Sequence, residues 1–319
     1  MLFEERNDMM KYKKGTLGEG EMYYYWLYGN LVESELEFPQ LVKVKKGDRE
    51  ADIMIVRGTM PEELLQKEKN GIRYEIGEEY SWLANSACMY YVEQGKKITY
   101  YLKPDGTELR LQNYILGFGM SLLFLQRGEM AIHCSALHNG KEAILIAGES
   151  GSGKSTITNH YLEHGWKLMA DDMAIVKYDK ERGSMVYPAF PFQKLCRNVA
   201  VERGYNLDEL IYINEDRDKF LVPYRGEFEL TPKKLKKFIM LGVYPGDEVI
   251  IREAQGMDKF HVCINNLGLR HLLGQKKYAP HIGQKCLELI ANVDVHLVAR
   301  PQGKDTTEEI KKAVFDIIL

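Results

Sequence analysis

Residues 142–156, EAILIAGESGSGKST, join an apolar run to a glycine-rich segment that ends in lysine, serine and threonine. From Gly148 to Ser155 this segment fits G-x-x-x-x-G-K-[ST] at each fixed position. The glycines of such a loop let successive backbone N–H groups point inward and bind phosphate oxygens. A helix that begins at the lysine directs the positive end of its dipole toward the same anion. The stretch therefore predicts a nucleotide-phosphate site between a buried strand and a helix.

The residues of this predicted phosphate loop have separate expected tasks. Lys154 is expected to reach the β- and γ-phosphates, and the Ser155 hydroxyl is expected to bind Mg²⁺. The predicted nucleotide-binding residues are Gly148, Glu149, Ser150, Gly151, Ser152, Gly153, Lys154, Ser155 and Thr156.

The predicted elements on both sides of the loop follow one another in the order expected of an α/β fold. Residues 131–138 predict a strand ahead of the loop strand. Behind the loop, a helix is expected from Lys154 to about His164 with a stop at Gly165, and residues 166–178 predict one strand. Strand, glycine-rich loop, helix and strand in this order are typical of an α/β protein.

Two adjacent carboxylates, Asp171 and Asp172, lie within the predicted strand 166–178. Apolar residues flank the pair, and an unpaired charge among apolar residues is costly, so a functional role is favoured over a solvated turn. Neighbouring residues of a strand point to opposite faces. One carboxylate can then hold Mg²⁺ while the other accepts the proton of an attacking hydroxyl, as phosphoryl transfer requires.

A histidine, His133, lies on the predicted strand that precedes the loop strand. Considered alone, a single histidine is more often a structural residue, and the sequence around it gives no further reason for a catalytic role.

Together these residues resemble the pattern of the HPr kinase/phosphorylase superfamily. Its members are bacterial protein-serine kinases with a phosphate loop and a nucleotide fold akin to phosphoenolpyruvate carboxykinase. His133, the loop 148–156, Gly165 and residues 168–172, LMADD, match the family pattern without a gap. The resemblance implies that Asp172 is the base for the hydroxyl and that His133 belongs to the active site.

The resemblance further implies that Asp171 is a partner to metal or phosphate, that ATP is the phosphoryl donor, and that Mg²⁺ is the cofactor. It is strong over about residues 130–178. Elsewhere the chain is similar to divergent HPr-kinase-like proteins, among which are lasso-peptide kinases that phosphorylate a precursor serine. The HPr enzyme's later glycine-rich signature and Arg-rich loop are not found here, so neither HPr as substrate nor the phosphorylase reaction is implied.

Three basic residues follow the acidic pair, at Lys194, Arg197 and Lys219. Similar positions in relatives often carry basic residues, and cations near a transferring phosphoryl group would stabilise its charge. Solvated surface charge is nevertheless the favoured interpretation of these three residues.

We expect two domains, a β-rich N-terminal domain over residues 1–112 and a catalytic domain over residues 113–319. Residues 96–114 predict two strands around a turn at 104–106, and the apolar run 115–125 predicts a buried helix. The tyrosine-rich segment from Tyr23 to Tyr28 is expected to pack in the core of the N-terminal domain. This domain is a candidate docking site for the acceptor, by strand addition.

The composition excludes several classes of protein. The chain has 319 residues, with 43 Lys and Arg against 46 Asp and Glu, so no overall positive charge is present to bind nucleic acid. The longest apolar run is too short to span a bilayer. The cysteine count of 5 is odd and no C-x-x-C pair occurs, which is typical of reduced thiols. A cytoplasmic protein without a nucleic-acid or membrane partner is expected, and its oligomeric state, a homo-oligomer included, stays open.

The sequence thus predicts an α/β fold, with a nucleotide-binding domain like that of HPr kinase and phosphoenolpyruvate carboxykinase behind a smaller β-rich domain. The predicted function is an ATP- and Mg²⁺-dependent kinase that phosphorylates a hydroxyl, a serine of a peptide or protein. Two alternatives stay open: a nucleotide-binding switch without catalysis, and a small-molecule or carboxykinase-like enzyme. Because no base-recognition motif is present, GTP or another donor also stays open.

Overall fold

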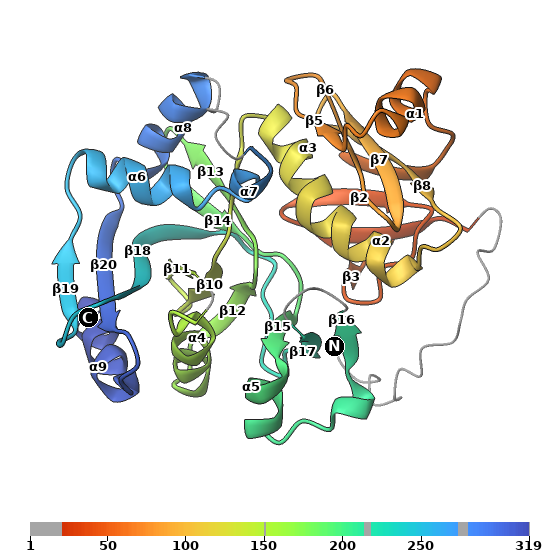
Figure 1. Cartoon of the computed structure of the whole chain (residues 1–319). Helices are drawn as coiled ribbons and strands as arrows, with labels where there is room; N and C mark the ends of the chain where they lie inside the picture. The colour runs from red at the N-terminus through yellow and green to blue at the C-terminus, as the bar shows by residue number, and fades with distance from the viewer. Residues whose placement is uncertain (1–20, 150, 214–217, 274–279, 319) are drawn as a thin grey trace.

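The computed structural model describes residues 21–149, 151–213, 218–273 and 280–318. Over these residues the protein is a mixed α/β structure with three sheets (Figure 1). No helix within the described ranges is long and apolar enough to cross a membrane.

The first sheet has eight strands in the order β3-β1-β2-β4-β8-β7-β6-β5. Its tyrosine-rich strand alternates, so that Tyr25 and Leu27 are fully buried, and Tyr28 in the following turn is 1% exposed. The expectation of core packing is confirmed for these residues. The elements of this part are β1 (Tyr23–Leu27), β2 (Asn30–Ser34), β3 (Val42–Lys43), β4 (Ile53–Arg57), α1 (Glu62–Lys69), β5 (Tyr74–Glu75), β6 (Tyr80–Ala84), β7 (Cys88–Glu93) and β8 (Lys97–Leu102).

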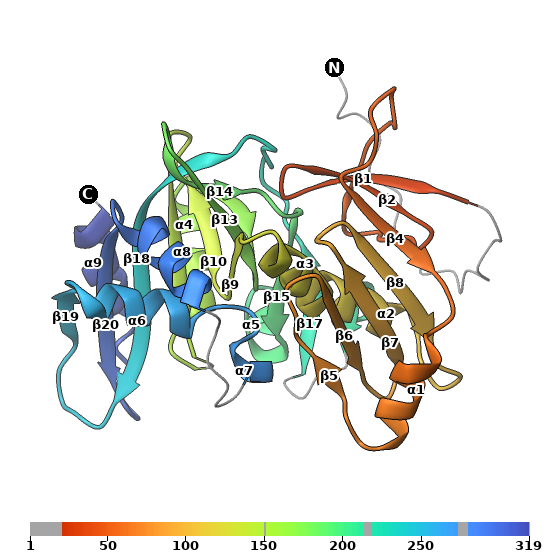
Figure 2. The same ribbon diagram turned by 90° about the horizontal axis from the view of Figure 1, so that it is seen from above.

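The predicted second strand after the turn at 104–106 is wrong, because the chain forms α2 (Glu108–Tyr114) there. Thr107 caps this helix, since its side chain accepts a hydrogen bond from the backbone N–H of Arg110. A π-helical turn, η1 (Ile115–Gly119), continues into α3 (Met120–Gln126), so the predicted buried helix is confirmed. α3 contacts both β7 of the first sheet and β9 (Met130–Ile132) of the second, and Figure 2 shows it between them.

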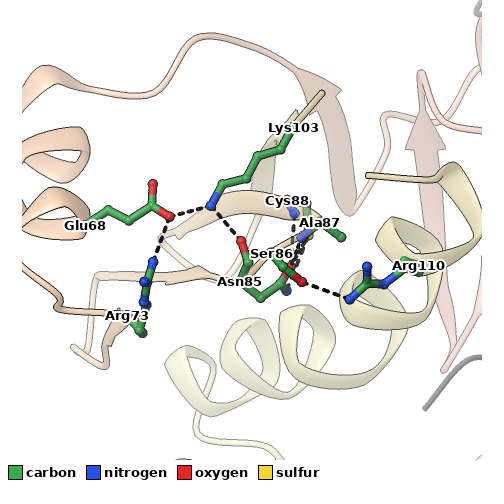
Figure 3. Close-up of polar contacts among 8 residues, drawn as sticks. All are labelled: Glu68, Arg73, Asn85, Ser86, Ala87, Cys88, Lys103 and Arg110. Atoms are coloured by element: carbon green, nitrogen blue, oxygen red, sulfur yellow. Dashed lines mark hydrogen bonds and ion pairs between the residues drawn. The ribbon is translucent and has the colours of Figure 1, made fainter. Parts of the chain in front are cut away.

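A polar cluster holds the turn between β6 and β7 to its neighbours (Figure 3). The Asn85 side chain accepts hydrogen bonds from the backbone N–H groups of Ala87 and Cys88. Lys103, just after β8, donates to the Asn85 carbonyl and also to Glu68 of α1. The cluster connects α1, the turn and the end of β8, so its role is to fix the structure of the first sheet.

The second sheet contains the predicted phosphate-loop strand. Its main order is β12-β10-β11-β18-β14-β13-β9, with β20 paired to β18 and β19 paired to β20. Strands β11, β18 and β20 are parallel, so their carboxyl ends lie at one edge, where ligands bind in open α/β sheets. The further strands are β10 (Ser135–His138), β11 (Glu142–Gly148), β12 (Lys167–Ala170), β13 (Ala174–Asp179), β14 (Gly183–Tyr187), β18 (Lys233–Tyr244), β19 (Ile250–Glu253) and β20 (Asp294–Pro301).

Helices cover both faces of the second sheet, which explains the continuous apolar run of β11. Ile144 and Ile146 pack in one core with α4 (Lys154–Glu163) and α9 (Thr307–Ile318), whereas Leu145 packs in the other core. α6 (Met257–Asn265) and α8 (Pro280–Ile290) contribute to that other core, and α7 (Arg270–Leu273) lies between them in the chain. The sequence predicted only short strands and turns in this region, so these helices correct it.

A small third sheet has the order β15-β17-β16 and lies beside α5 (Arg197–Glu202). Leu195, Phe220 and Val222 of its strands pack with Ala200 of α5 in a separate small core. The strands are β15 (Phe192–Cys196), β16 (Ile211–Ile213) and β17 (Lys219–Pro223). A short 3-10 turn, η2 (Leu207–Glu209), lies between α5 and β16.

The first sheet packs directly onto the second part of the chain. The backbone N–H of Tyr28 donates to the Pro188 carbonyl (3.0 Å), and Gly29 approaches the Tyr187 ring so closely that a Cβ there would lie 2.5 Å from it. One apolar core runs through residues of both parts. The division into domains 1–112 and 113–319 stays a prediction.

Candidate functional site

The acidic pair and the histidine lie at a break between two pairs of strands. On one side of the break β10 pairs with β12, and on the other side β9 pairs with β13. The predicted strand 166–178 is in fact two strands, β12 and β13, with a bend between them, and His133 lies in a matching bend between β9 and β10. These two strand predictions are therefore wrong in detail. The antiparallel register continues across the break, since Ala136 pairs with Ala170 and Ile132 pairs with Ala174. At the interruption the side chains of His133 and Asp172 lie close to one another.

Asp172 bends the chain at this break. Its φ of 71° lies in the left-handed region, which Asp tolerates better than most residues because its short side chain can hydrogen-bond locally. In a continuous strand the two carboxylates would point to opposite faces. In the structure a bend directs the two carboxylates to different partners: Asp171 to Ser135 and Asp172 to Lys194.

The predicted phosphate loop lies between the end of β11 and the first residue of α4. Gly151 and Gly153 have φ values of 83° and 100°, which only glycine adopts readily, and α4 begins at Lys154 as predicted. At Gly148 a Cβ would lie 2.8 Å from the Leu241 carbonyl oxygen of β18, so only glycine fits this approach. Ser150, which was also predicted to bind nucleotide, lies outside the described residues.

Asp172 is surrounded by positive charge. One carboxylate oxygen accepts a hydrogen bond from Lys194 Nζ at 3.0 Å, and the other lies 3.9 Å from Lys219 Nζ. Burial alone would raise the pKa of Asp172, but the charge of Lys194, with those of Lys219 and Lys154, holds this pKa well below its ordinary value. The carboxylate is therefore ionised throughout the physiological pH range.

The third sheet brings the two lysines to Asp172. Cys196 pairs with Lys219 across β15 and β17, and Lys194 is two residues from Cys196, so both lysines lie on one face of this sheet. The other face carries the apolar residues against α5. The lysine side chains are only 13% and 16% exposed, so solvated surface charge is wrong for both.

Arg197 behaves differently from the two lysines. Its side chain is 50% exposed and forms an ion pair with Asp218 at 2.6 Å. For Arg197 the interpretation as solvated surface charge agrees with the structure. Sequence position alone did not separate it from Lys194, because the two residues are three apart in one basic segment.

Asp171 holds three segments of the site together. One carboxylate oxygen accepts a hydrogen bond from Ser135 Oγ at 2.6 Å, and the other accepts from the backbone N–H of Lys194 at 2.8 Å. Asp171 thereby connects the bend after β12 with β10 and with β15. Its assignment to metal or phosphate stays a prediction, and each carboxylate oxygen retains a lone pair beyond these bonds.

His133 lies beside the acidic pair, with its Nδ1 3.8 Å from Asp172 Oδ1. Its backbone N–H donates to the Asn266 carbonyl at 2.7 Å, which fixes the bend. Desolvation, together with the charge of Lys154, lowers the pKa of His133 to about 4. The imidazole is therefore neutral at neutral pH and can offer a hydrogen bond there but no charge.

We expect His133 to make the stability of the protein depend on pH between its ordinary pKa of 6.5 and about 4. In this window the unfolded chain binds a proton at His133 that the folded protein does not bind, so the free energy of unfolding falls as the pH falls. Thermal unfolding of the His133→Gln variant should show a weaker decline than the wild type. Equal slopes in wild type and His133→Gln would contradict the prediction.

Within the described ranges, no three His, Cys, Asp or Glu side chains gather as a metal-binding group. Mg²⁺, the predicted cofactor, is commonly bound by one or two protein oxygens together with phosphates and water. Ser155 in the first turn of α4 and Asp171 supply oxygens of the required type.

A small pocket of about 20 Å³ adjoins the acidic pair, and residues of the first sheet help to line it. Tyr28 donates from its hydroxyl to the Met173 carbonyl at 3.1 Å. Gln40 is 3% exposed, and its side-chain oxygen has no hydrogen-bond partner among the described residues. The sequence does not identify either residue as part of the site, because nothing in the local pattern links them to a segment more than 130 residues away.

No family model matches the chain, and no curated protein matches it. Among solved structures, the chain is similar to the HPr(Ser) kinase/phosphatase from Coxiella burnetii, with 14% identity and a TM-score of 0.30. The match covers 59% of this chain and 90% of that chain. A likeness of this size leaves the function to be argued from the site itself.

Proposed function

We propose that this protein is a kinase that transfers the γ-phosphoryl group of ATP to a hydroxyl group, a serine of a peptide or protein. The observation that carries the proposal is the cluster around Asp172. It combines a permanently ionised carboxylate with Lys194 and Lys219, next to a phosphate loop whose Lys154 is close enough to influence the pKa of Asp172. Phosphoryl transfer needs these parts: a phosphate cradle, cations for the transferring group, and a carboxylate for the attacking hydroxyl.

The loop is suited to the phosphates of the donor. Its backbone N–H groups and the N-terminal end of α4 favour an anion, and Lys154 stands at the first position of that helix. Mg²⁺ would be held by Ser155 and Asp171, where it would neutralise phosphate charge.

Asp172 would bind and orient the acceptor hydroxyl and take its proton. The low pKa of Asp172 makes it a weak base. In a loose transition state, however, the hydroxyl proton needs to leave only after the phosphoryl group has largely moved. Asp172 would then accept the proton late in the transfer, and it would also hold the hydroxyl oxygen in line with the γ-phosphorus.

Lys194 and Lys219 would serve two partners in turn. Without donor they neutralise Asp172, at 3.0 Å and 3.9 Å from its carboxylate oxygens. During transfer, negative charge spreads over the oxygens of the phosphoryl group, and the same ammonium groups would stabilise it.

The acceptor would approach from the side of the first sheet. The pocket beside Asp172 is shared by Tyr28 and Gln40 of that part, and its small size suits the end of a short side chain such as serine. The unpartnered oxygen of Gln40, counted over the described residues, would receive a hydrogen bond from the acceptor. Strand addition at an edge of this sheet stays part of the proposal.

The test is phosphoryl transfer by the full chain from ATP labelled at the γ-phosphate, with Mg²⁺ and an array of peptides that differ in serine, threonine and tyrosine. We expect label on serine peptides and none with the Lys154→Met variant, which removes the cation from the loop. Binding of ATP without transfer to any hydroxyl would contradict the kinase proposal and favour a nucleotide-binding switch. Transfer to small alcohols but to no peptide would contradict the proposed acceptor.

A further inference from the structure

A hydrogen bond between two buried amide side chains joins α4 to β15, which lie next to each other in Figure 1. Gln193 Nε2 donates to Asn159 Oδ1 at 3.0 Å, and each residue is 4% exposed. The bond connects segments that are 34 residues apart in the chain. Because a buried amide that loses its partner destabilises the protein, this bond holds α4 and β15 at one separation.

On α4, the bond lies one helical turn beyond the residues expected to bind the donor. Asn159 follows Ser155 by four positions, and residues four apart are neighbours on one face of a helix. The backbone hydrogen bonds of the helix connect Asn159 to Ser155 and Lys154. A change in the position of Asn159 relative to β15 would therefore move the Ser155 hydroxyl as well.

On β15, Gln193 precedes Lys194, which contacts both members of the acidic pair. The backbone N–H of Lys194 donates to Asp171 at 2.8 Å, and its Nζ donates to Asp172 at 3.0 Å. Neighbouring residues of a strand point to opposite faces, so Gln193 reaches α4 from the face opposite to Lys194 Nζ. β15 is thus bonded to α4 and to the acidic pair at two consecutive residues.

The two amides therefore connect the two residues that are expected to hold Mg²⁺. Ser155 is carried by α4, and Asp171 is bonded to β15 through the Lys194 backbone. Mg²⁺ demands near-ideal octahedral geometry with its ligands at about 2.0–2.1 Å, so a small error in the separation of two ligands weakens its binding. Replacing a group that supports a metal ligand from behind commonly changes metal affinity by about 10- to 100-fold.

We propose that Asn159 and Gln193 are positioning residues for Mg²⁺, because their hydrogen bond sets the separation of Ser155 and Asp171. The inference rests on the proposed function, since it takes Ser155 and Asp171 as the Mg²⁺ ligands. Neither amide touches the phosphates in this role. Replacing the amides should therefore change how ATP binding depends on Mg²⁺, and it should leave ATP binding without Mg²⁺ unchanged.

The test is calorimetric titration of the full chain with ATP at a series of Mg²⁺ concentrations, which gives the Mg²⁺ concentration for half of the full gain in ATP affinity. Asn159→Gln and Gln193→Asn each change the length of the link by one methylene group, and each should raise this Mg²⁺ concentration at least about tenfold. The double variant exchanges the two side chains and keeps the total length. It should return to within about threefold of the wild type, whereas residues that only fill space would show additive losses.

Thr158→Val is the matched control on the same helix. Thr158 is fully buried beside Asn159 in the chain, and its hydroxyl oxygen has no hydrogen-bond partner among the described residues. Valine has nearly the same shape, so this variant should leave the Mg²⁺ dependence unchanged.

Gln193→Met, which has a similar length and lacks the donor, takes the place of a single variant that does not fold. Unchanged Mg²⁺ dependence in the folded single variants, or additive losses in the double variant, would overturn the positioning role. A wild-type protein that binds ATP at no Mg²⁺ concentration would instead overturn the proposed function.

Discussion

Replacing Asp172 with Asn is expected to lower the rate of phosphoryl transfer by about 10²- to 10⁴-fold, the range for loss of a general base. The amide keeps the shape of the side chain but cannot take the proton of the hydroxyl. ATP should still bind, because the phosphate loop is unchanged. Single-turnover transfer and ATP titration of the same preparation measure the two quantities separately.

The same variant has a second expected effect, on stability. It leaves Lys194 and Lys219 without their carboxylate, so the melting temperature without nucleotide should fall. The phosphates of bound ATP would replace the lost negative charge, so ATP should stabilise Asp172→Asn more than it stabilises the wild type. Asp316→Asn, at an exposed position of α9, changes the same charge and should alter none of these quantities. Transfer at the wild-type rate by Asp172→Asn would show that its carboxylate is not the base.

Replacing Lys194 with Met is expected to lower transfer by about 10²- to 10³-fold, since it removes a fixed cation from the site of developing charge. The backbone N–H of Lys194 would still donate to Asp171, so the scaffold of the site should survive. The pKa of Asp172 should rise, because Lys194 is its strongest charge partner. The measurement is the rate of transfer at saturating ATP, with circular dichroism as a check on folding.

Arg197→Met is the matched control for this variant. Arg197 lies in the same basic segment but is half exposed and paired with Asp218 at the surface, so its loss should change transfer by less than about twofold. Combining Asp172→Asn with Lys194→Met should cost much less than the product of the two single effects, because the two residues act as one unit. Equal, small effects of Lys194→Met and Arg197→Met would contradict the site described above.

Local patterns predicted the conformation at Gly151, Gly153 and the start of α4 well, because it depends on neighbouring residues. The glycines at 151 and 153 adopt positive φ values, the helix begins at Lys154, and Gly165, with a φ of 87°, follows the end of α4. Prediction failed where local propensity was ambiguous. Residues 108–114 alternate as a strand would, yet the Thr107 cap and the continuation into α3 make them helical.

The bend at Asp172 was missed for a different reason. Residues 166–178 are apolar enough to form one strand, but β12 pairs with β10 whereas β13 pairs with β9 and β14. The chain must therefore change neighbours at Asp171–Met173. Only the arrangement of the whole sheet sets that point.

By itself, the sequence determined the glycine turns at 151 and 153, the helix that follows them and the presence of two carboxylates after that helix. Each of these depends on residues close together in the chain, so spacing and residue type are sufficient. Only the tertiary structure decided which basic residues lie beside Asp172. It also decided that Asp171 accepts hydrogen bonds from Ser135 and from the backbone N–H of Lys194. The contacts of Arg300 with the Gly151 carbonyl and of Tyr28 with the Met173 carbonyl depend on it as well. These contacts connect separate sheets, and a pairing between distant segments is fixed by the packing of all the elements together.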